Sequence, residues 1–404
     1  MTGRPPSPGF RGARLREARE AFGLTIVSLA DMLGLTRQGL ANYESGERTP
    51  ATEIADRIAE KLAMPRRFFF SEPLDLGNEP VFYRSLAAAT KTARRKAEQR
   101  LSWLEEALVP IEKQVELPMV NLPKLRLPLD PSELSDEDIE DAAAAVREHW
   151  ELPDGPIGNL VEVAERHGFV VTRFHMDAPT LDAFSRWSPT VGRPLVALNS
   201  GKGSASRQRL DTAHEIGHQI LHRHVDASAL RKPAILKSIE AQAFLFGAAL
   251  LMPVDSFLND VDSTSLESLK ALKASWKVSI GAMLMRLVNL NIVSEKDSKY
   301  LWRSYAMQGF RRAEPLDDVI EHEVPTLAAR AVNTLGGAQA LSNILSSISL
   351  SDALTEELLG LRAGPITPSV AAVFHIPDSR ERDRAAEPAR DAEVLPFRRP
   401  LKQN

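Results

Sequence analysis

The 404-residue sequence contains no cysteine. This absence excludes disulfide bonds, zinc sites built from thiolates, and catalysis by a cysteine nucleophile. Any metal ion must therefore be held by histidine and carboxylate side chains. The chain is too long for one ordinary hydrophobic core, so we expect two to four domains.

Long apolar runs and a strong excess of one charge are also missing. The longest apolar run, residues 243–254, is far shorter than the roughly 20 residues that a membrane-spanning helix needs. Residues 1–10 are rich in proline and glycine and have no apolar stretch, so we expect no signal peptide. The formal net charge is only −4. These features predict a cytoplasmic protein without membrane contact.

The pentapeptide His-Glu-Ile-Gly-His at residues 214–218 is the most informative pattern present. Helix positions i and i+4 share a face, so the imidazoles of His214 and His218 can bind one ion. Zinc held by two such histidines and a third protein ligand lowers the pKa of its water to about 7. Glu215 is then the predicted general base of a peptide-hydrolysing centre. The alternative is a surface helix with two unrelated histidines.

Two further histidines are poor candidates for the third ligand. His222 would lie about 12 Å from His214 on an intact helix, because each residue adds about 1.5 Å of rise. His224 has the spacing of the HExxHxxGxxH pattern. That pattern needs a glycine where this chain has Leu221, so we expect neither His222 nor His224 to bind the ion.

Glu240 is a better candidate for the third ligand. We expect it to open a helix over residues 240–251, from which its carboxylate would complete a site of two histidines and one glutamate. Gln242 is a weaker candidate because it is neutral. The residues alone leave the role of Glu240 open, since a carboxylate at a helix start also stabilises the helix dipole.

Residues 11–70 predict a compact bundle of four short helices. Arg11–Phe22 has the pattern of the first helix, and Thr25 is expected to cap the second. Gly34 begins a tight turn, after which Thr36 starts the third helix. Two short helices around such a turn are typical of the helix-turn-helix, whose second helix enters the DNA major groove. A helical protein-interaction module is the alternative.

The third helix of this bundle carries the predicted DNA contacts, which are Thr36, Arg37, Gln38 and Asn42. Glutamine and asparagine can pair with adenine and arginine with guanine, while Thr36 at the helix start suits a phosphate. Residues 1–70 contain 11 basic and 8 acidic side chains. Because this excess is small, we expect DNA affinity to come from a homodimer.

Two stretches of the bundle, residues 29–38 and 43–50, resemble the Xre/Cro-like repressors. Further segments resemble the ImmA/IrrE family of zinc metallopeptidases, at residues 182–185, 193–199, 209–222 and 240–253. By that likeness His214, His218 and Glu240 bind Zn²⁺ and Glu215 is the base. Phe244 departs from the family, which often has asparagine or aspartate there.

Members of that family typically cleave a helix-turn-helix repressor and so release its genes. The resemblance therefore implies a DNA-binding regulatory zinc metallo-endopeptidase, with operator DNA and a repressor substrate as partners. The alternative is a transcriptional regulator whose zinc-binding domain senses a metal or a ligand without proteolysis. A third interpretation is an antitoxin-like protein whose peptidase fold serves mainly as an interaction surface.

The expected fold is α+β and predominantly helical, with a helix-turn-helix bundle, a zincin-like metallopeptidase domain around a small β-sheet, and a C-terminal helical region. We expect strands at residues 169–175 and 195–199 in a sheet of about three strands, with 195–199 as an edge that holds extended substrate. We predict a helix-turn-helix domain at residues 11–72, a linker with a long helix at 73–129 and the metallopeptidase domain at 130–260. A helical region at 261–362 and a disordered tail at 363–404 follow.

Two parts of this division rest on weaker patterns. A long polar helix from about residue 85 to 117 carries a basic patch, which we interpret as the solvated face of a spacer or dimerising helix. Residues 266–290 show a second helix-turn-helix-like pattern whose second helix is largely apolar, so we expect it to pack or to dock substrate.

Overall fold

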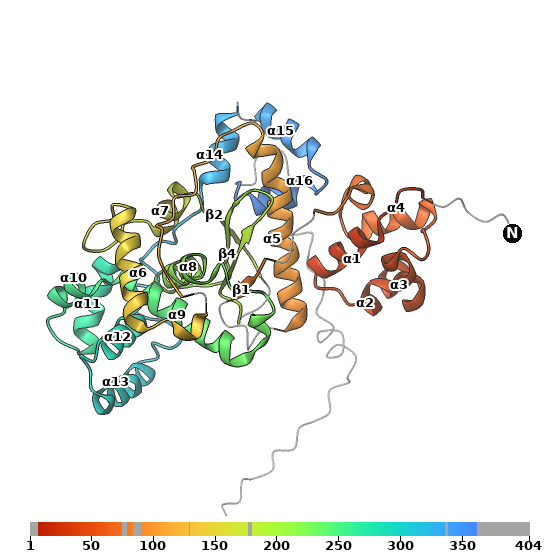
Figure 1. Ribbon diagram of the computed structural model, residues 1–404. Helices are drawn as coiled ribbons and strands as arrows, with labels where there is room; N and C mark the ends of the chain where they lie inside the picture. The colour runs from red at the N-terminus through yellow and green to blue at the C-terminus, as the bar shows by residue number, and fades with distance from the viewer. Residues whose placement is uncertain are drawn as a thin grey trace, which may run out of the picture. The chain divides into compact units, whose positions relative to one another are not determined.

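The computed structural model of the protein describes residues 7–74, 79–83, 90–128, 130–176, 180–335 and 338–361. The predicted tail over 363–404 lies outside the described residues. The described chain is mostly helical, with one small sheet, as the sequence predicts (Figure 1).

The predicted N-terminal bundle is present. It consists of α1 (Gly12–Ala21), α2 (Ile26–Leu33), α3 (Arg37–Ser45), α4 (Thr52–Lys61) and a 3-10 turn (Arg66–Phe70). The hydroxyl of Thr25 accepts a hydrogen bond from the amide of Ser28, which caps α2 as expected. Gly34 adopts a φ of +63° and ends α2, so the turn before α3 needs the freedom of glycine. Leu29 and Leu40 are fully buried in the bundle core.

The long helix α5 (Lys91–Glu112) is not a solvated spacer. Trp103 in its middle is fully buried and packs against Phe22 and Phe68 of the N-terminal bundle. Glu105, also fully buried, forms an ion pair with Arg186 of the sheet. The helix therefore contacts both the bundle and the sheet, and its exposed residues lie in its basic N-terminal turns.

The sheet has four strands in the order β1-β3-β4-β2. They are β1 (Val81–Tyr83), β2 (Val170–Phe174), β3 (Ala183–Ser188) and β4 (Arg193–Asn199). β1 pairs antiparallel with β3, β3 pairs antiparallel with β4, and β2 runs parallel to β4. β1 was not predicted from the sequence.

The prediction that residues 195–199 form an edge strand is wrong. β4 lies between β3 and β2. Residues 195–198 are all fully buried, so both faces of this strand are covered. A continuous apolar run of this kind is typical of a central strand rather than an edge.

Further helices frame the sheet and carry His214 and His218. They are α6 (Asp136–His149), α7 (Leu160–Arg166), α8 (Ala205–Gly217), a π-helical turn η3 (His218–His222) and α9 (Pro233–Leu251). α8 packs closely on α9, where a side chain on Gly247 would place its Cβ 3.0 Å from the backbone nitrogen of His214. Glycine at this position lets the two helices approach each other.

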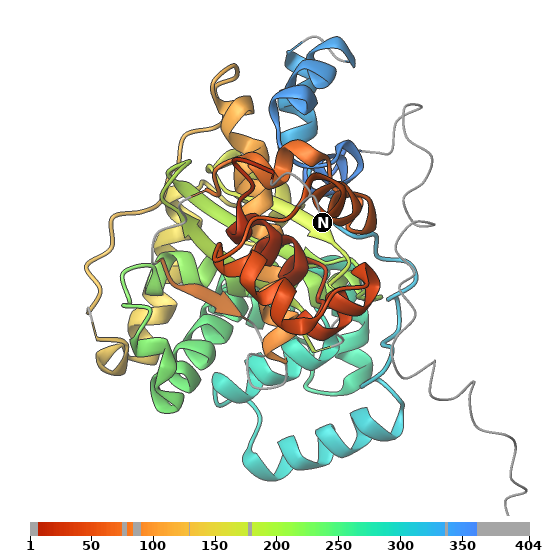
Figure 2. The ribbon, with the colours of Figure 1, turned by 90° about the vertical axis from the view of Figure 1, so that its right-hand side faces the viewer.

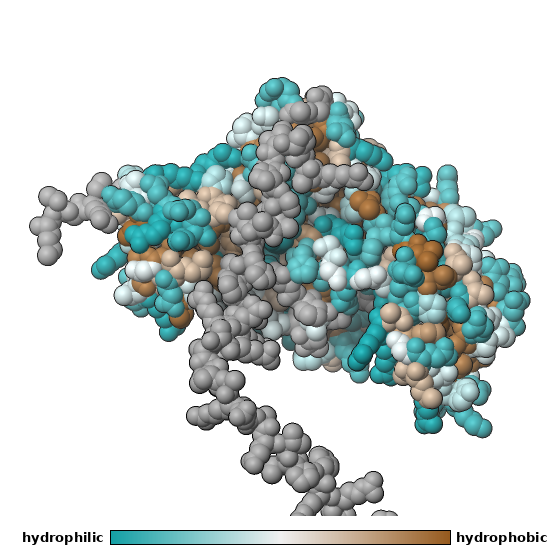
Figure 3. Space-filling view, turned by 180° about the vertical axis from the view of Figure 1, so that it is seen from behind, coloured by the Kyte–Doolittle hydropathy of each residue, from teal (hydrophilic) through white to brown (hydrophobic). Residues whose placement is uncertain are grey.

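Among the described residues, α9 is the one helix long and apolar enough to span a membrane. Its most apolar window is 56% buried, and the helix contacts α8 and α6, as a core helix does. On the face shown in Figure 3, apolar residues form separate patches among hydrophilic ones.

The remaining helices are α10 (Val254–Asp260), α11 (Leu266–Trp276), α12 (Ile280–Asn289), α13 (Glu295–Met307), α14 (Leu327–Thr334), α15 (Ala338–Ser347) and α16 (Asp352–Leu358). Those from α10 to α13 lie together, coloured green to cyan in Figure 2. Met283, Leu284 and Leu287 of α12 are fully buried. α12 is therefore a packing helix.

A buried ion pair joins α11 to the segment after α13. Nζ of Lys273 lies 2.9 Å from a carboxylate oxygen of Glu314, and both side chains are fully buried. The same carboxylate accepts hydrogen bonds from the amides of Ile280 and Gly281, which begin α12, and from the hydroxyl of Tyr305. Glu314 thus fixes three helices at once.

Replacing Lys273 with alanine is expected to lower the free energy of unfolding by about 3–5 kcal/mol, because it removes the nearest positive charge from the buried Glu314 carboxylate and an ion-pair partner from Asp317. Urea unfolding measures the change. The control is Lys270→Ala, since Lys270 forms an exposed pair with Glu267 and should contribute less than about 1 kcal/mol. Equal losses in the two variants would contradict this role of Glu314.

Candidate metal centre

The structure brings His214, His218 and Glu240 together. Nε2 of His214 and Nε2 of His218 lie 3.0 Å apart. The two carboxylate oxygens of Glu240 lie 3.4 Å from His214 Nε2 and 3.3 Å from His218 Nε2. Across the described ranges, this is the one group of three histidine, aspartate or glutamate side chains that clusters closely enough to hold a metal ion.

The spacing of these donor atoms fits zinc. Zinc bonds to nitrogen and oxygen are about 2.0–2.2 Å long, so neighbouring ligands of a tetrahedral ion lie about 3.3–3.5 Å apart. The observed separations of 3.0–3.4 Å come within a few tenths of an ångström of that value. Two imidazoles and one carboxylate are also a donor set that zinc prefers.

Glu240 reaches the histidines from α9. The helix begins at Pro233, seven residues earlier than predicted, because proline at the first helical position fixes a helical φ and needs no amide partner. Glu240 therefore lies inside the helix rather than at its start. Burial raises the pKa of Glu240, but its interactions with His214 and His218 outweigh burial and lower the pKa to about 2. The side chain is thus a carboxylate at neutral pH.

His222 holds His218 through a chain of hydrogen bonds. Nε2 of Gln242 donates to the carbonyl of Pro131 at 2.6 Å, which leaves Oε1 of Gln242 as an acceptor. That oxygen lies 3.0 Å from Nε2 of His222, which must donate to it. Nδ1 of His222 then accepts from Nδ1 of His218 at 3.2 Å. Nε2 of His218 keeps its lone pair for a metal, as ligating histidines require.

His222 is therefore an outer partner of the centre rather than a ligand. It is fully buried, and burial, followed by its proximity to His218, lowers its pKa well below 6.5. From its spacing in the sequence, His222 was expected not to bind the ion, and no outer role was predicted for it. Its i+4 spacing from His218 was nevertheless a signal that the two rings share a helix face.

Glu215, the predicted base, lies on α8 beside His214 and is fully buried. Helix α8 continues directly into the π-helical turn that carries His218 and His222. Such turns are rare in proteins, and those that do occur are frequently found at functional sites. Glu215 is thereby held in the rigid element that also positions His214 and His218.

Phe82 of β1 covers the centre, and sequence reasoning missed it. Its ring lies parallel to the imidazole of His218, with centroids 4.6 Å apart and planes 10° from parallel. The same ring is 6.2 Å from that of His222. No local pattern in the sequence links residue 82 to a helix that begins more than 100 residues later.

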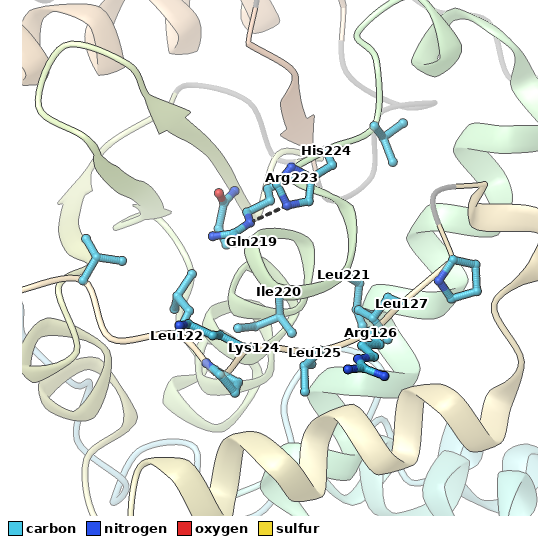
Figure 4. A pocket seen from close by; sticks show the side chains of 14 residues that line it. Leu122, Lys124, Leu125, Arg126, Leu127, Gln219, Ile220, Leu221, Arg223 and His224 are labelled. Atoms are coloured by element: carbon cyan, nitrogen blue, oxygen red, sulfur yellow. Dashed lines mark hydrogen bonds between the residues drawn. The ribbon is translucent and has the colours of Figure 1, made fainter.

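His224 is not part of the centre. Its side chain is exposed and lies 3.0 Å from Nε of Arg223, and the two line a groove of about 510 Å³ (Figure 4). The groove lies between the η3 end and residues 120–128. Its lining does not include His214, His218 or Glu240.

The predicted DNA-contacting residues lie along α3. Thr36, Arg37 and Gln38 are exposed, and Asn42 is half-buried. The hydroxyl of Thr36 accepts a hydrogen bond from the amide of Gly39 and so caps the helix. The side chains of Gln38 and Asn42 lie 2.7 Å apart, one helical turn from each other. Arg37 and Gln38 are thus available to a ligand outside the bundle.

Two segments of the chain match families of known proteins. Residues 164–288 match the family described as the IrrE N-terminal-like domain, and residues 15–69 match the family described as helix-turn-helix. The chain therefore combines a helix-turn-helix DNA-binding domain of the XRE type with an IrrE/ImmA-like domain of a metallopeptidase family.

Several curated relatives match a short part of the chain. A protein of Pyrococcus furiosus named as an HTH-type transcriptional regulator is 40% identical over 63 residues, which is 16% of this chain and 18% of that protein. A similarly named protein of Thermococcus kodakarensis is 30% identical over 104 residues, 26% of this chain and 31% of that protein. The chain thus spans less than a third of the length of these relatives.

Proposed function

We propose that the chain is a zinc-dependent metallo-endopeptidase that cleaves a helix-turn-helix repressor and thereby controls transcription. The observation that carries this proposal is the convergence of His214, His218 and Glu240, with donor atoms 3.0–3.4 Å apart, beside the buried Glu215. We retain the domain boundaries 11–72, 73–129 and 130–260 as part of the proposal. A cytoplasmic location, where DNA is accessible, accompanies it.

The residues divide the chemistry between them. His214, His218 and Glu240 would hold a zinc ion, which would supply a water of lowered pKa and polarise a scissile carbonyl. Glu215 accepts one proton from that water as its oxygen bonds to the carbonyl carbon. Glu215 then delivers the proton to the departing nitrogen as the C–N bond breaks, which leaves a carboxylic acid, still carrying the second proton of the water, and an amine. His222 keeps His218 in the required tautomer throughout.

The N-terminal domain supplies the DNA contacts in this proposal. Arg37 and Gln38 read base edges in the major groove, Asn42 supports Gln38, and Thr36 lies at the helix start that approaches a phosphate. A homodimer would place two copies of α3 on two operator half-sites.

Arg37→Ala is expected to weaken binding to the selected operator by roughly 5- to 150-fold, the equivalent of about 1–3 kcal/mol for one bidentate base contact. The operator is first selected from a pool of random DNA duplexes, and affinity is then measured by fluorescence anisotropy at fixed salt. Lys299→Ala removes the same charge from an exposed site on α13 and should change affinity less than twofold. Equal losses would contradict base reading by α3.

The regulatory role is tested in cells. Native cells and cells carrying Glu215→Gln are compared by sequencing all new protein N-termini under inducing conditions. The proposal expects a repressor that is cut only in the native cells, followed by expression of the genes it controls. A substrate with no DNA-binding domain would contradict the repressor assignment while leaving the peptidase intact.

A metal sensor that does not cleave is the second candidate. It is favoured by α5, which contacts both the N-terminal bundle and the sheet beside the metal centre, and so could couple metal occupancy to DNA binding. Footprinting on the chain's own promoter, with and without zinc, tests it. A footprint that changes with zinc in Glu215→Gln as in the native protein supports sensing.

A further inference from the structure

β1 lies on the one edge of the sheet that is next to the metal centre. Val81, Phe82 and Tyr83 pair antiparallel with residues 184–186 of β3. The other side of β3 is paired with β4, so β3 would be the edge strand if β1 were displaced. An edge strand presents unpaired backbone groups to which an extended segment can add.

This edge is joined directly to the helix that carries the centre. Nε2 of Gln219, one residue after His218, donates to the hydroxyl of Ser185 at 2.9 Å. Ser185 is the residue of β3 that pairs with Phe82. An extended segment on β3 therefore crosses the centre at this position, and the side chain there meets the imidazole of His218.

The surface that receives the Phe82 ring combines apolar side chains with the flat imidazole of His218. Phe82 is buried with Val225 and Ile239 in a small cluster separate from the two main hydrophobic cores. Its ring stacks on the His218 imidazole rather than packing among aliphatic side chains alone. An aromatic ring satisfies both features, because it fills an apolar space and offers a face for stacking.

The strand that fills this surface is short. Its pairing covers three residues, at the lower limit of strand length, and begins directly after Pro80, which has no amide hydrogen to donate. Of its two described side chains, Phe82 is buried and Val81 is partly buried against a main hydrophobic core. A segment of similar chemistry from another protein can therefore replace it with equivalent contacts.

We propose that the outer edge of β3 binds an extended protein segment with an aromatic residue stacked on His218, and that residues 81–83 are the intramolecular ligand that fills this site until such a segment displaces them. The inference rests on the proposed peptidase function, for which it defines the class of segment that is recognised. In the absence of such a segment, residues 81–83 therefore block the site of the proposed peptidase.

The test is the binding of a fluorescein-labelled peptide, Glu-Pro-Val-Phe-Tyr, which copies residues 79–83. Binding is measured in the full-length Glu215→Gln protein, so that it does not depend on cleavage. Adding Phe82→Ala is expected to tighten peptide binding about tenfold or more, because a filled site lowers apparent affinity in proportion to its occupancy. Phe82→Leu keeps the apolar volume without the flat ring and should give an intermediate gain.

The controls separate ring stacking from general effects. A peptide with alanine in place of phenylalanine should bind none of these proteins measurably. Tyr300→Ala removes an exposed aromatic side chain on α13 and should leave peptide binding unchanged. Circular dichroism verifies that each variant is folded.

Three results would overturn the inference. One is unchanged peptide affinity in both folded Phe82 variants, and another is equal binding of the alanine peptide. The third is a cut within residues 79–83 of the native zinc-loaded protein, detected by intact mass, because the segment would then be a substrate rather than an occupying ligand. Peptide binding by a native zinc-loaded protein that cuts no member of a proteome-derived peptide library would contradict the peptidase function alone.

Discussion

Glu240→Ala is expected to lower the affinity of the protein for zinc by at least about a hundredfold. Glu240 is the only charged member of the donor set, and it contacts Nε2 of both His214 and His218. Losing a direct ligand should exceed the 10- to 100-fold loss that follows removal of an outer partner. The measurement is competition between the protein and a chromophoric chelator at pH 7.

The matched control for this variant is Glu267→Ala, which removes an equally charged but exposed side chain on α11. It should keep the native zinc affinity within about twofold. Unchanged zinc affinity in Glu240→Ala would show that another residue completes the site. In that event the exposed His224 and the buried Gln242 would be the next residues to substitute.

Glu215→Gln is expected to reduce the rate of peptide cleavage by about 10²- to 10⁴-fold, the contribution typical of a general base. Glutamine has nearly the same size as glutamate but cannot accept the proton from water. Because Glu215 is not one of the three clustered ligands, zinc affinity should stay unchanged. Single-turnover cleavage rates and metal content, measured on the same preparations, give both quantities.

Glu295→Gln makes the same chemical change at an exposed position on α13 and should cleave at the native rate. Loss of zinc from Glu215→Gln would contradict the separation of base from ligands. Cleavage at the native rate would exclude Glu215 as the proton acceptor.

Features with a local cause could be predicted from the sequence. The four N-terminal helices follow from apolar spacing, from the capping hydroxyl of Thr25 and from the left-handed turn at Gly34. The convergence of His214 and His218 follows from helix geometry alone. These inferences use residues within a few positions of each other, where backbone geometry is nearly fixed.

Features that depend on distant segments could not be predicted. Three residues of β1 form a strand only because β3 offers an edge, and Phe82 is buried because His218, Val225 and Ile239 lie around it. The orientation of His218 depends on His222 and on Gln242, which is held by the carbonyl of Pro131, 111 residues before Gln242 in sequence. Contacts of this kind leave no periodic pattern in the sequence.

The position of β4 and the burial of α5 have the same explanation. The sequence correctly placed a strand near residues 195–199, but its neighbours are set by the pairing of β3 and β2 around it. The basic residues at the start of α5 suggested a solvated helix. Trp103 and Glu105 further along are buried by partners from both the bundle and the sheet.

Mass spectrometry of new N-termini in a proteome-derived peptide library tests the peptidase assignment most directly. The native protein and Phe82→Ala are each incubated with the library, zinc-loaded and zinc-free, beside zinc-loaded Glu215→Gln. We predict new termini that require both zinc and Glu215, with more of them in Phe82→Ala because its site is open. The same termini in every sample, or none in either zinc-loaded protein that retains Glu215, would contradict the assignment.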